Sequence, residues 1–173
     1  MAEIKWAESA HHLPIEDFSP NPRNPKKHTK KQLEHIRNSI LHFGFLDPIG
    51  VWGKDHVVVE GHGRLEALKQ LVQDGKIRIP AEGVPCIMLD HLSKRDRDAY
   101  MLEHNQSTME TPWDDDLLDD VLGDIANEGL DMEPFGFEMP GEEDGEDGKY
   151  TSSVNIPQYE VRGEMPNFAD MLD

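Results

Sequence analysis

The chain is poor in cysteine, in long apolar runs and in enzyme signature motifs. Cys86 is the one cysteine among 173 residues, so no disulfide can form within the chain. Its place in the apolar stretch 84–89 favours a buried, inert thiol. No apolar run approaches the roughly 20 residues of a membrane span, and the first residues lack the apolar core of a signal peptide. No Walker or methyltransferase motif is present. We therefore expect a soluble, cytoplasmic protein with no membrane contact.

Positive charge is scarce in the second half of the chain. The net charge is −18, and residues 1–100 hold 15 Lys and Arg against 14 Asp and Glu, whereas residues 101–173 hold 2 against 21. The N-terminal part can therefore face an anionic ligand. The C-terminal part would repel DNA and suits a basic protein partner, so we expect DNA binding to be weak or indirect.

The most informative stretch is 57–72, V-V-V-E-G-H-G-R-L-E-A-L-K-Q-L-V. Its pattern predicts a strand, a turn with Gly61 and Gly63, and a helix with Arg64 in its first turn. Glycines let the backbone approach a ligand, and the first N–H groups of a helix attract anions. The Arg64 guanidinium adds a positive fork that suits phosphate. The plainer alternative is an ordinary tight turn with a surface arginine.

The segments before this stretch predict a loop, a helix and a hairpin. Three prolines and two asparagines in 19–25 exclude a helix there. A capping box at 29–32 starts a helix over 30–43, and strands are expected at 45–52 and 56–59. A basic cluster lies at the helix start. It is expected either to contact an anion or DNA, or to be an ordinary solvent-exposed basic edge of the surface. Its members are Arg23, Lys26, Lys27 and Lys30.

The segments after it become polar and then acidic. A strand is expected at 84–89, followed by a helix over 94–103 that ends in the polar box E-H-N-Q-S-T. This box is either a frayed helix end with its cap, or a set of ligands for a divalent cation or a nucleotide phosphate. A further helix should start at 111–114 with its proline in the first turn. Residues 130–137 are apolar enough to pack back on the core.

Taken together, these motifs resemble the N-terminal domain of the ParB family, whose fold is shared with sulfiredoxin. The order is P-I-E-D-F, N-P-R-N-P, S-I-L-H-F-G-F-L-D-P-I-G-V-W, V-E-G-H-G-R-L-E-A-L and E-H-N-Q-S-T, between about Leu13 and Thr108. The resemblance implies an α+β fold with a small mixed sheet and flanking helices, followed here by a helical extension and a flexible acidic tail. Sulfiredoxin chemistry is excluded, because that enzyme uses a cysteine in its G-x-H-R turn, whereas this chain has Gly63 before Arg64 and no cysteine nearby.

The resemblance also implies a bound nucleoside triphosphate, ATP or CTP, with Mg²⁺. His104 occupies a position where the family has an acidic residue, and neighbouring Glu103 can substitute for it. The residues assigned to nucleotide binding are Gly61, His62, Gly63, Arg64, Asn105, Gln106 and Ser107. Those assigned to the metal are Glu103, His104 and Asn105. In an enzyme of this fold, Glu16 or Glu60 would act as the base.

Three classes of function follow from these residues. The first is a nucleotide-binding accessory or regulatory protein of a phage or mobile-element DNA-processing or DNA-modification system, able to form a homodimer and to dock a protein partner through its acidic C-terminal region. This context rests on the resemblance of E-T-P-W-D-D-D-L-L and G-L-D-M-E-P-F-G-F to extensions of ParB-like phage proteins, and on the lack of a basic recognition helix after Thr108. The second is an NTPase or phosphotransferase. The third is an acidic DNA mimic or interaction protein.

A nuclease ranks lower, because residues 1–110 show no carboxylate cluster suited to two metals. The expected organisation of the chain is a leader at 1–12, a ParB-like nucleotide-binding domain at 13–110, a helical extension at 111–137, an acidic linker at 138–149 and a partner-docking tail at 150–173.

Overall fold

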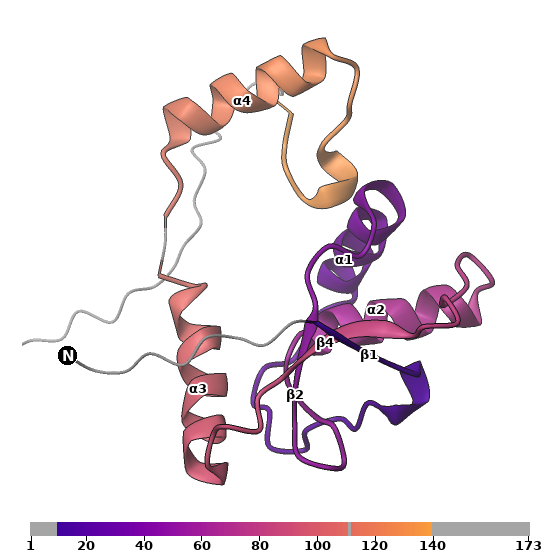
Figure 1. Cartoon of the computed structure of the whole chain (residues 1–173). Helices are drawn as coiled ribbons and strands as arrows, with labels where there is room; N and C mark the ends of the chain where they lie inside the picture. The colour runs from indigo at the N-terminus through magenta and orange to yellow at the C-terminus, as the bar shows by residue number, and fades with distance from the viewer. Residues whose placement is uncertain (1–9, 111, 140–173) are drawn as a thin grey trace, which may run out of the picture. The chain divides into compact units, whose positions relative to one another are not determined.

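A small mixed sheet forms the centre of the fold. The computed structural model describes residues 10–110 and 112–139. The strand order is β1-β4-β2-β3, with β2 and β4 parallel and the other pairs antiparallel (Figure 1). The strands are β1 (His11–Leu13), β2 (Ile49–Trp52), β3 (Val57–Glu60) and β4 (Val84–Met88). This arrangement confirms the predicted α+β class with a small mixed sheet.

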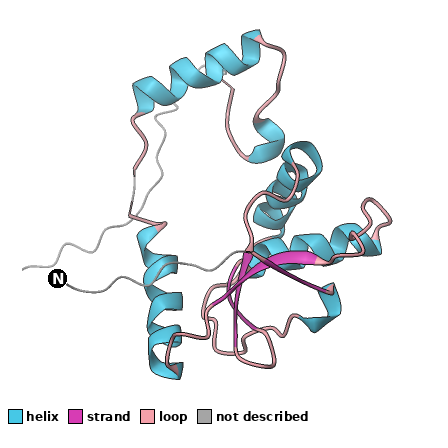
Figure 2. Ribbon diagram, in the orientation of Figure 1, coloured by secondary structure: helices cyan, strands magenta, loops and turns pink. Residues whose placement is uncertain are grey.

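The described residues also form four α-helices and two 3₁₀ turns (Figure 2). The α-helices are α1 (Lys30–Phe43), α2 (His62–Gln73), α3 (Lys94–Ser107) and α4 (Asp115–Asn127). The 3₁₀ turns are η1 (Ile15–Asp17) and η2 (Glu133–Phe135). None of the helices in the described part of the chain has both the length and the apolar content needed to cross a bilayer. The predicted acidic linker and tail, from residue 140 onward, and most of the predicted leader lie outside the described residues.

The core lies between the sheet and α2. Ile49, Val51 and Val58 of the sheet pack with Leu65 and Leu68 of α2 in one buried cluster. Burying such side chains contributes about 1.5–3 kcal/mol each. The α1 helix also packs against α2. The packing of α2 against both the sheet and α1 fixes the position of the turn between β3 and α2.

The one thiol of the chain is buried at the centre of the sheet. Cys86 is 0% exposed on β4, between β1 and β2. Burial raises the pKa of the Cys86 thiol, which keeps it protonated and unreactive. The predicted burial of this cysteine is confirmed.

Helix α1 has the bounds that its capping box predicts. The Thr29 hydroxyl accepts a hydrogen bond from the Gln32 N–H at 3.1 Å, and the helix ends at Gly44, whose N–H bonds to the Ile40 carbonyl. The first strand of the hairpin begins later than expected, at Ile49. Pro48 has no N–H for the ladder, which accounts for this shorter strand.

Two helices differ from the sequence prediction. The α3 helix runs through the polar box to Ser107, instead of ending at Glu103. The Ser107 and Thr108 hydroxyls donate to the His104 and Asn105 carbonyls at 3.3 and 2.9 Å, which satisfies acceptors that the helix end leaves open. The α4 helix begins at Asp115, so its proline lies outside the helix. Its N-cap is Asp114, whose carboxylate accepts from the Leu117 N–H.

The segment after α4 returns to α1, whereas its apolar residues predict packing on the core. The amide of Asn38 donates to the Pro134 carbonyl at 2.8 Å. The rings of Phe43 and Phe135 have centroids 5.0 Å apart. This packing ties η2 to the outer surface of α1.

Candidate functional site

The turn between β3 and α2 presents an uncapped helix N-terminus. Gly61 adopts a φ of +85° and makes no side-chain cap. The first N–H groups of α2 therefore have neither an intrahelical acceptor nor a capping oxygen. A Cβ at Gly61 would lie 3.1 Å from Arg64 Nη2 and 3.3 Å from Ile49 Cγ1. Glycine is thus required here both for the left-handed backbone and for space.

Arg64 is held in place beside these N–H groups. Its Nη2 donates to the Pro48 carbonyl at 3.0 Å, and its Nη1 lies 2.5 Å from a carboxylate oxygen of Asp47. The Arg64 side chain is 26% exposed, whereas Asp47 is 69% exposed. The guanidinium is therefore oriented by Asp47 and Pro48, which lie in the loop before β2. An incoming phosphate would compete with the exposed Asp47 carboxylate for it.

Gly63 has a different environment from the one the sequence predicts. The helix already begins at His62, so Gly63 lies inside its first turn and is buried. A Cβ there would lie 2.9 Å from His28 Cε1 and 3.0 Å from Ile36 Cδ1. The small side chain therefore lets the start of α1 approach α2. These two side chains fill the space beside Gly63 in which the sequence predicts a ligand.

His62, the first residue of α2, is partly buried beside His28. Desolvation, and then the charge of His28, lower the pKa of His62 to about 4. Its Nε2 is buried and has no hydrogen-bond partner within the described residues. His62 is therefore neutral at physiological pH and offers an uncharged ring nitrogen at the helix start.

Stability should fall in acid because of His62. His62 takes up a proton near pH 6.5 in the unfolded chain and only near pH 4 in the folded chain. The contribution of this pKa difference to the free energy of unfolding is therefore fully present above pH 6.5 and is lost as the pH falls toward 4. The His62→Gln variant should lose less of its urea midpoint between pH 7 and pH 5 than the wild type. The matched His91→Gln change at an exposed position should not alter this loss. Equal losses in all three proteins would contradict the assignment.

The carboxylate of Glu60 joins β3 to α3. Its Oε2 accepts a hydrogen bond from the Tyr100 hydroxyl at 3.1 Å and lies 3.5 Å from His104 Nδ1. Burial, the charge of Glu60 and this hydrogen bond, with a smaller effect of Glu103, raise the pKa of Tyr100 to about 12. Tyr100 was not singled out in the sequence. Its position one helical turn before His104 is the signal that could have indicated it.

The polar box occupies the last turn of α3. His104 brings this turn next to the β3–α2 connection through Glu60. Gln106 donates to Glu110 at 2.8 Å, and Ser107 to the His104 carbonyl, while Asn105 is partly buried. Gln106 and Ser107 are thus engaged at the end of their own helix, whereas His104 contacts Glu60 of β3.

The proposed metal ligands do not form a cage. Glu103, His104 and Asn105 are consecutive on a helix and point about 100° apart, so they cannot all reach one ion. Over residues 10–110 and 112–139, no group of three or more His, Cys, Asp and Glu side chains is placed to hold a metal. A Mg²⁺ ion would have to be held mainly by the phosphates of its nucleotide.

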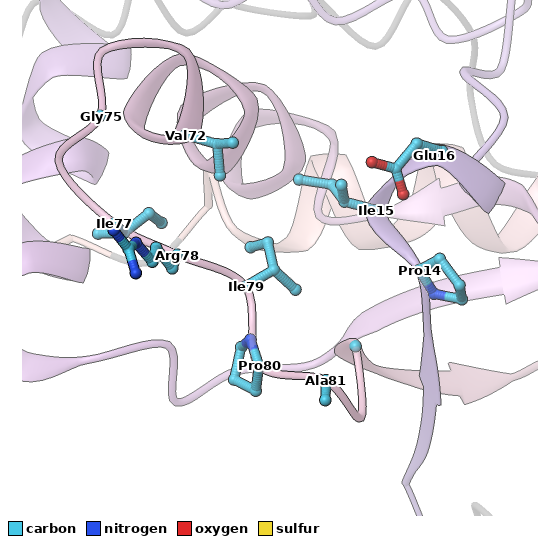
Figure 3. Close-up of a pocket in the computed structure, with 11 residues that line it drawn as sticks. Pro14, Ile15, Glu16, Val72, Gly75, Ile77, Arg78, Ile79, Pro80 and Ala81 are labelled. Carbon is cyan, nitrogen blue, oxygen red and sulfur yellow. The ribbon is translucent and has the colours of Figure 1, made fainter.

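Glu16 lies away from the rest of the predicted site. It lines a cavity of about 550 Å³ with Ile15, Val72 and the 77–81 segment (Figure 3). Val72 belongs to the C-terminal end of α2, which lies roughly 12 Å along the helix axis from Arg64. The structure therefore does not bring Glu16 and Glu60 together.

Three members of the basic cluster lie on the loop before α1, and the fourth, Lys30, is the first residue of that helix. Arg23 Nη1 forms an ion pair with Asp98 of α3 at 3.1 Å. Lys26 and Lys27 come directly before His28, whose ring lies against Gly63. The two lysines are thus carried on the loop that borders the start of α2, whereas Arg23 is directed to α3.

Comparison with known proteins identifies relatives of this fold. Residues 2–105 match the ParB N-terminal domain. A probable chromosome-partitioning protein ParB of Campylobacter jejuni is 37% identical over 62 residues, which is 34% of this chain and 22% of that protein. The ParB-like nuclease domain-containing protein YnaK of Escherichia coli K12 is 30% identical over 80 residues, or 46% of this chain and 82% of YnaK.

Solved structures give the same result for the fold. The C-terminally truncated chromosome-partitioning protein ParB from Caulobacter crescentus, crystallised with CTP-γ-S, superposes with a TM-score of 0.55 at 21% identity, covering 73% of this chain and 68% of that one. The matched family segment spans more than half of the present sequence, from the first residues to the last turn of α3. The chain belongs to the ParB N-terminal domain family.

Proposed function

We propose that this chain binds a nucleoside triphosphate, CTP or ATP, at the start of α2. The observation that carries the proposal is the Arg64 guanidinium, held beside an uncapped helix N-terminus. Gly61 and His62 form the turn, and Lys26 and Lys27 border it. The CTP analogue in the Caulobacter crescentus ParB structure supports the choice of ligand class.

The last turn of α3 supplies the second side of the proposed site. Glu60 links this turn to the β3–α2 connection through His104, and in this proposal Asn105, Gln106 and Ser107 of the same turn contact a phosphate or the ribose. In this proposal Mg²⁺ enters with the phosphates, and Glu103 or Asn105 contributes a single oxygen.

Titration calorimetry of the wild-type chain tests the proposal. ATP, CTP, GTP and ADP are each added with and without Mg²⁺. We expect one triphosphate to bind, and to bind more tightly with Mg²⁺, because the metal reduces the repulsion between the phosphates and the nearby Asp47 and Glu60 carboxylates. Absence of heat and of a melting shift with every nucleotide would contradict nucleotide binding.

The wider role that we propose is that of an accessory or regulatory protein in a phage or mobile-element DNA-processing or DNA-modification system. The acidic C-terminal region would dock a protein partner. No lysine or arginine occurs between Arg97 and Lys149, which disfavours direct DNA contact by this part of the chain.

An NTPase or phosphotransferase activity is the second candidate. It is favoured by the position of Glu60, whose carboxylate immediately precedes Gly61 and is 17% exposed. Against it, one oxygen of Glu60 is already engaged by Tyr100 and His104. The calorimetry samples can be assayed for released phosphate. Release that is lost in Glu60→Gln would favour the enzyme, and no release from the wild type would exclude it.

A further inference from the structure

Helix α4 and the residue before its N-cap carry a row of largely exposed apolar side chains, the first of which, Trp113, contacts the Phe137 ring edge-on with centroids 6.0 Å apart. Trp113, Leu117 and Val121 follow one another at intervals of four residues and are 68%, 60% and 45% exposed. Leu122 of the same helix is 2% exposed. The helix therefore buries one apolar face and leaves a second one in solvent. An exposed apolar row of this kind is typical of an interaction surface.

An acidic row runs beside the apolar one. Asp116, Asp120 and Asp124 also follow at intervals of four residues, and all three are exposed. Asp120 is three residues after Leu117, and Asp124 is three residues after Val121, so these pairs are neighbours on the helix surface. No lysine or arginine between Arg97 and Lys149 neutralises the row. The surface thus combines apolar anchors with a flanking strip of negative charge.

We infer that this face of α4, from Trp113 to Asp124, docks a basic amphipathic helix of a partner protein. Apolar side chains of the partner would cover Leu117 and Val121, while its lysines or arginines would pair with Asp120 and Asp124. The same charges repel DNA and anionic membranes. A second copy of the chain would bring an identical acidic row, which opposes self-association through this face.

This inference specifies the partner-docking part of the proposed function and does not depend on nucleotide binding. The surface lies on α4, whereas Arg64 lies at the start of α2. The Arg64→Ala variant should therefore bind the partner helix as well as the wild type does. Failure of one proposal can in this way be told apart from failure of the other.

The test uses a synthetic peptide with the full chain. The probe is a fluorescein-labelled helical peptide of leucine and lysine with all leucines on one face, and its counterpart carries glutamate for every lysine. Fluorescence anisotropy should show binding of the lysine peptide only. Leu117→Ser combined with Val121→Ser should weaken binding about tenfold or more, as expected when central anchors are lost. Circular dichroism of the variants checks that these exposed changes leave the helices intact.

A charge-matched pair of variants tests the position of the surface. Asp120→Asn with Asp124→Asn should weaken binding about tenfold, because two charge pairs are removed. Asp115→Asn with Asp119→Asn changes the charge equally on the opposite side of α4 and should have less than about a twofold effect. Equal losses in both pairs, or unchanged binding in the serine variant, would overturn the inference. Self-association of the wild type in sedimentation, abolished by the serine variant, would replace the partner by a second copy.

Discussion

Replacing Arg64 by alanine should lower the affinity for the nucleotide about 100-fold, or roughly 2.7 kcal/mol. Charge-assisted hydrogen bonds to phosphate each contribute about 1.5–3 kcal/mol, and the guanidinium is oriented by the Pro48 carbonyl before any ligand arrives. Arg64→Lys should recover only part of the loss, because an ammonium group cannot form the two-pronged contact. Calorimetry with the nucleotide that the wild type binds gives both values.

Two further variants separate ligand binding from structural damage. Lys76→Ala removes one exposed positive charge beyond the end of α2 and should leave the affinity unchanged. Asp47→Asn removes the ion-pair partner of Arg64 and should leave binding intact or strengthen it, since Asp47 no longer competes with phosphate. If Asp47→Asn abolished binding as completely as Arg64→Ala does, the site would depend on the ion pair and the proposed phosphate contact would be wrong.

Gly83→Ala should lower the free energy of unfolding by about 3 kcal/mol or more. Gly83 has a φ of +100°, and a Cβ there would lie 2.4 Å from the carbonyl oxygen and 2.6 Å from the carbonyl carbon of Leu13. Both are backbone atoms of β1, so β1 would have to move away from β4. A drop of roughly 10 °C in the melting temperature is expected by calorimetry.

Gly75→Ala is the matched control for this effect. Gly75 also has a positive φ, of +65°, but nothing lies within 4 Å of a Cβ built there. Its replacement should cost only the backbone strain of a non-glycine residue, about 1–2 kcal/mol. If the two variants melted at the same temperature, contact with β1 would contribute nothing and strain alone would explain Gly83.

The elements that could be predicted from the sequence are those whose signals are local. Helix α1 has its cap, its apolar spacing and its terminal glycine within one short segment, and both its ends are as predicted. The turn at Gly61 was likewise visible from the neighbouring valines and leucines. The end of α3 was not, because polar side chains that interrupt an apolar pattern can equally well bond back to their own helix.

The arrangement of the site depends on contacts between distant segments, which a single sequence does not display. Tyr100 and Glu60 meet because α3 packs on the end of β3. The ring of His28 fills the space beside Gly63 because α1 packs on α2. Glu16, which looked like a candidate base, instead lies at the other end of α2 with the 77–81 segment. Which of these residues contact a nucleotide stays a prediction.

Because Cys86 is buried, the reactivity of its thiol can measure how often the core opens. The thiol lies on β4 between two partner strands, where no reagent can reach it. Because strand side chains point to the faces of the sheet, reaction with a thiol-specific reagent requires that the core cluster around Cys86 open, so its rate measures the frequency of that opening in the native protein. Because no second thiol competes, a cysteine introduced on the surface could also carry a probe selectively, without any change to the interior.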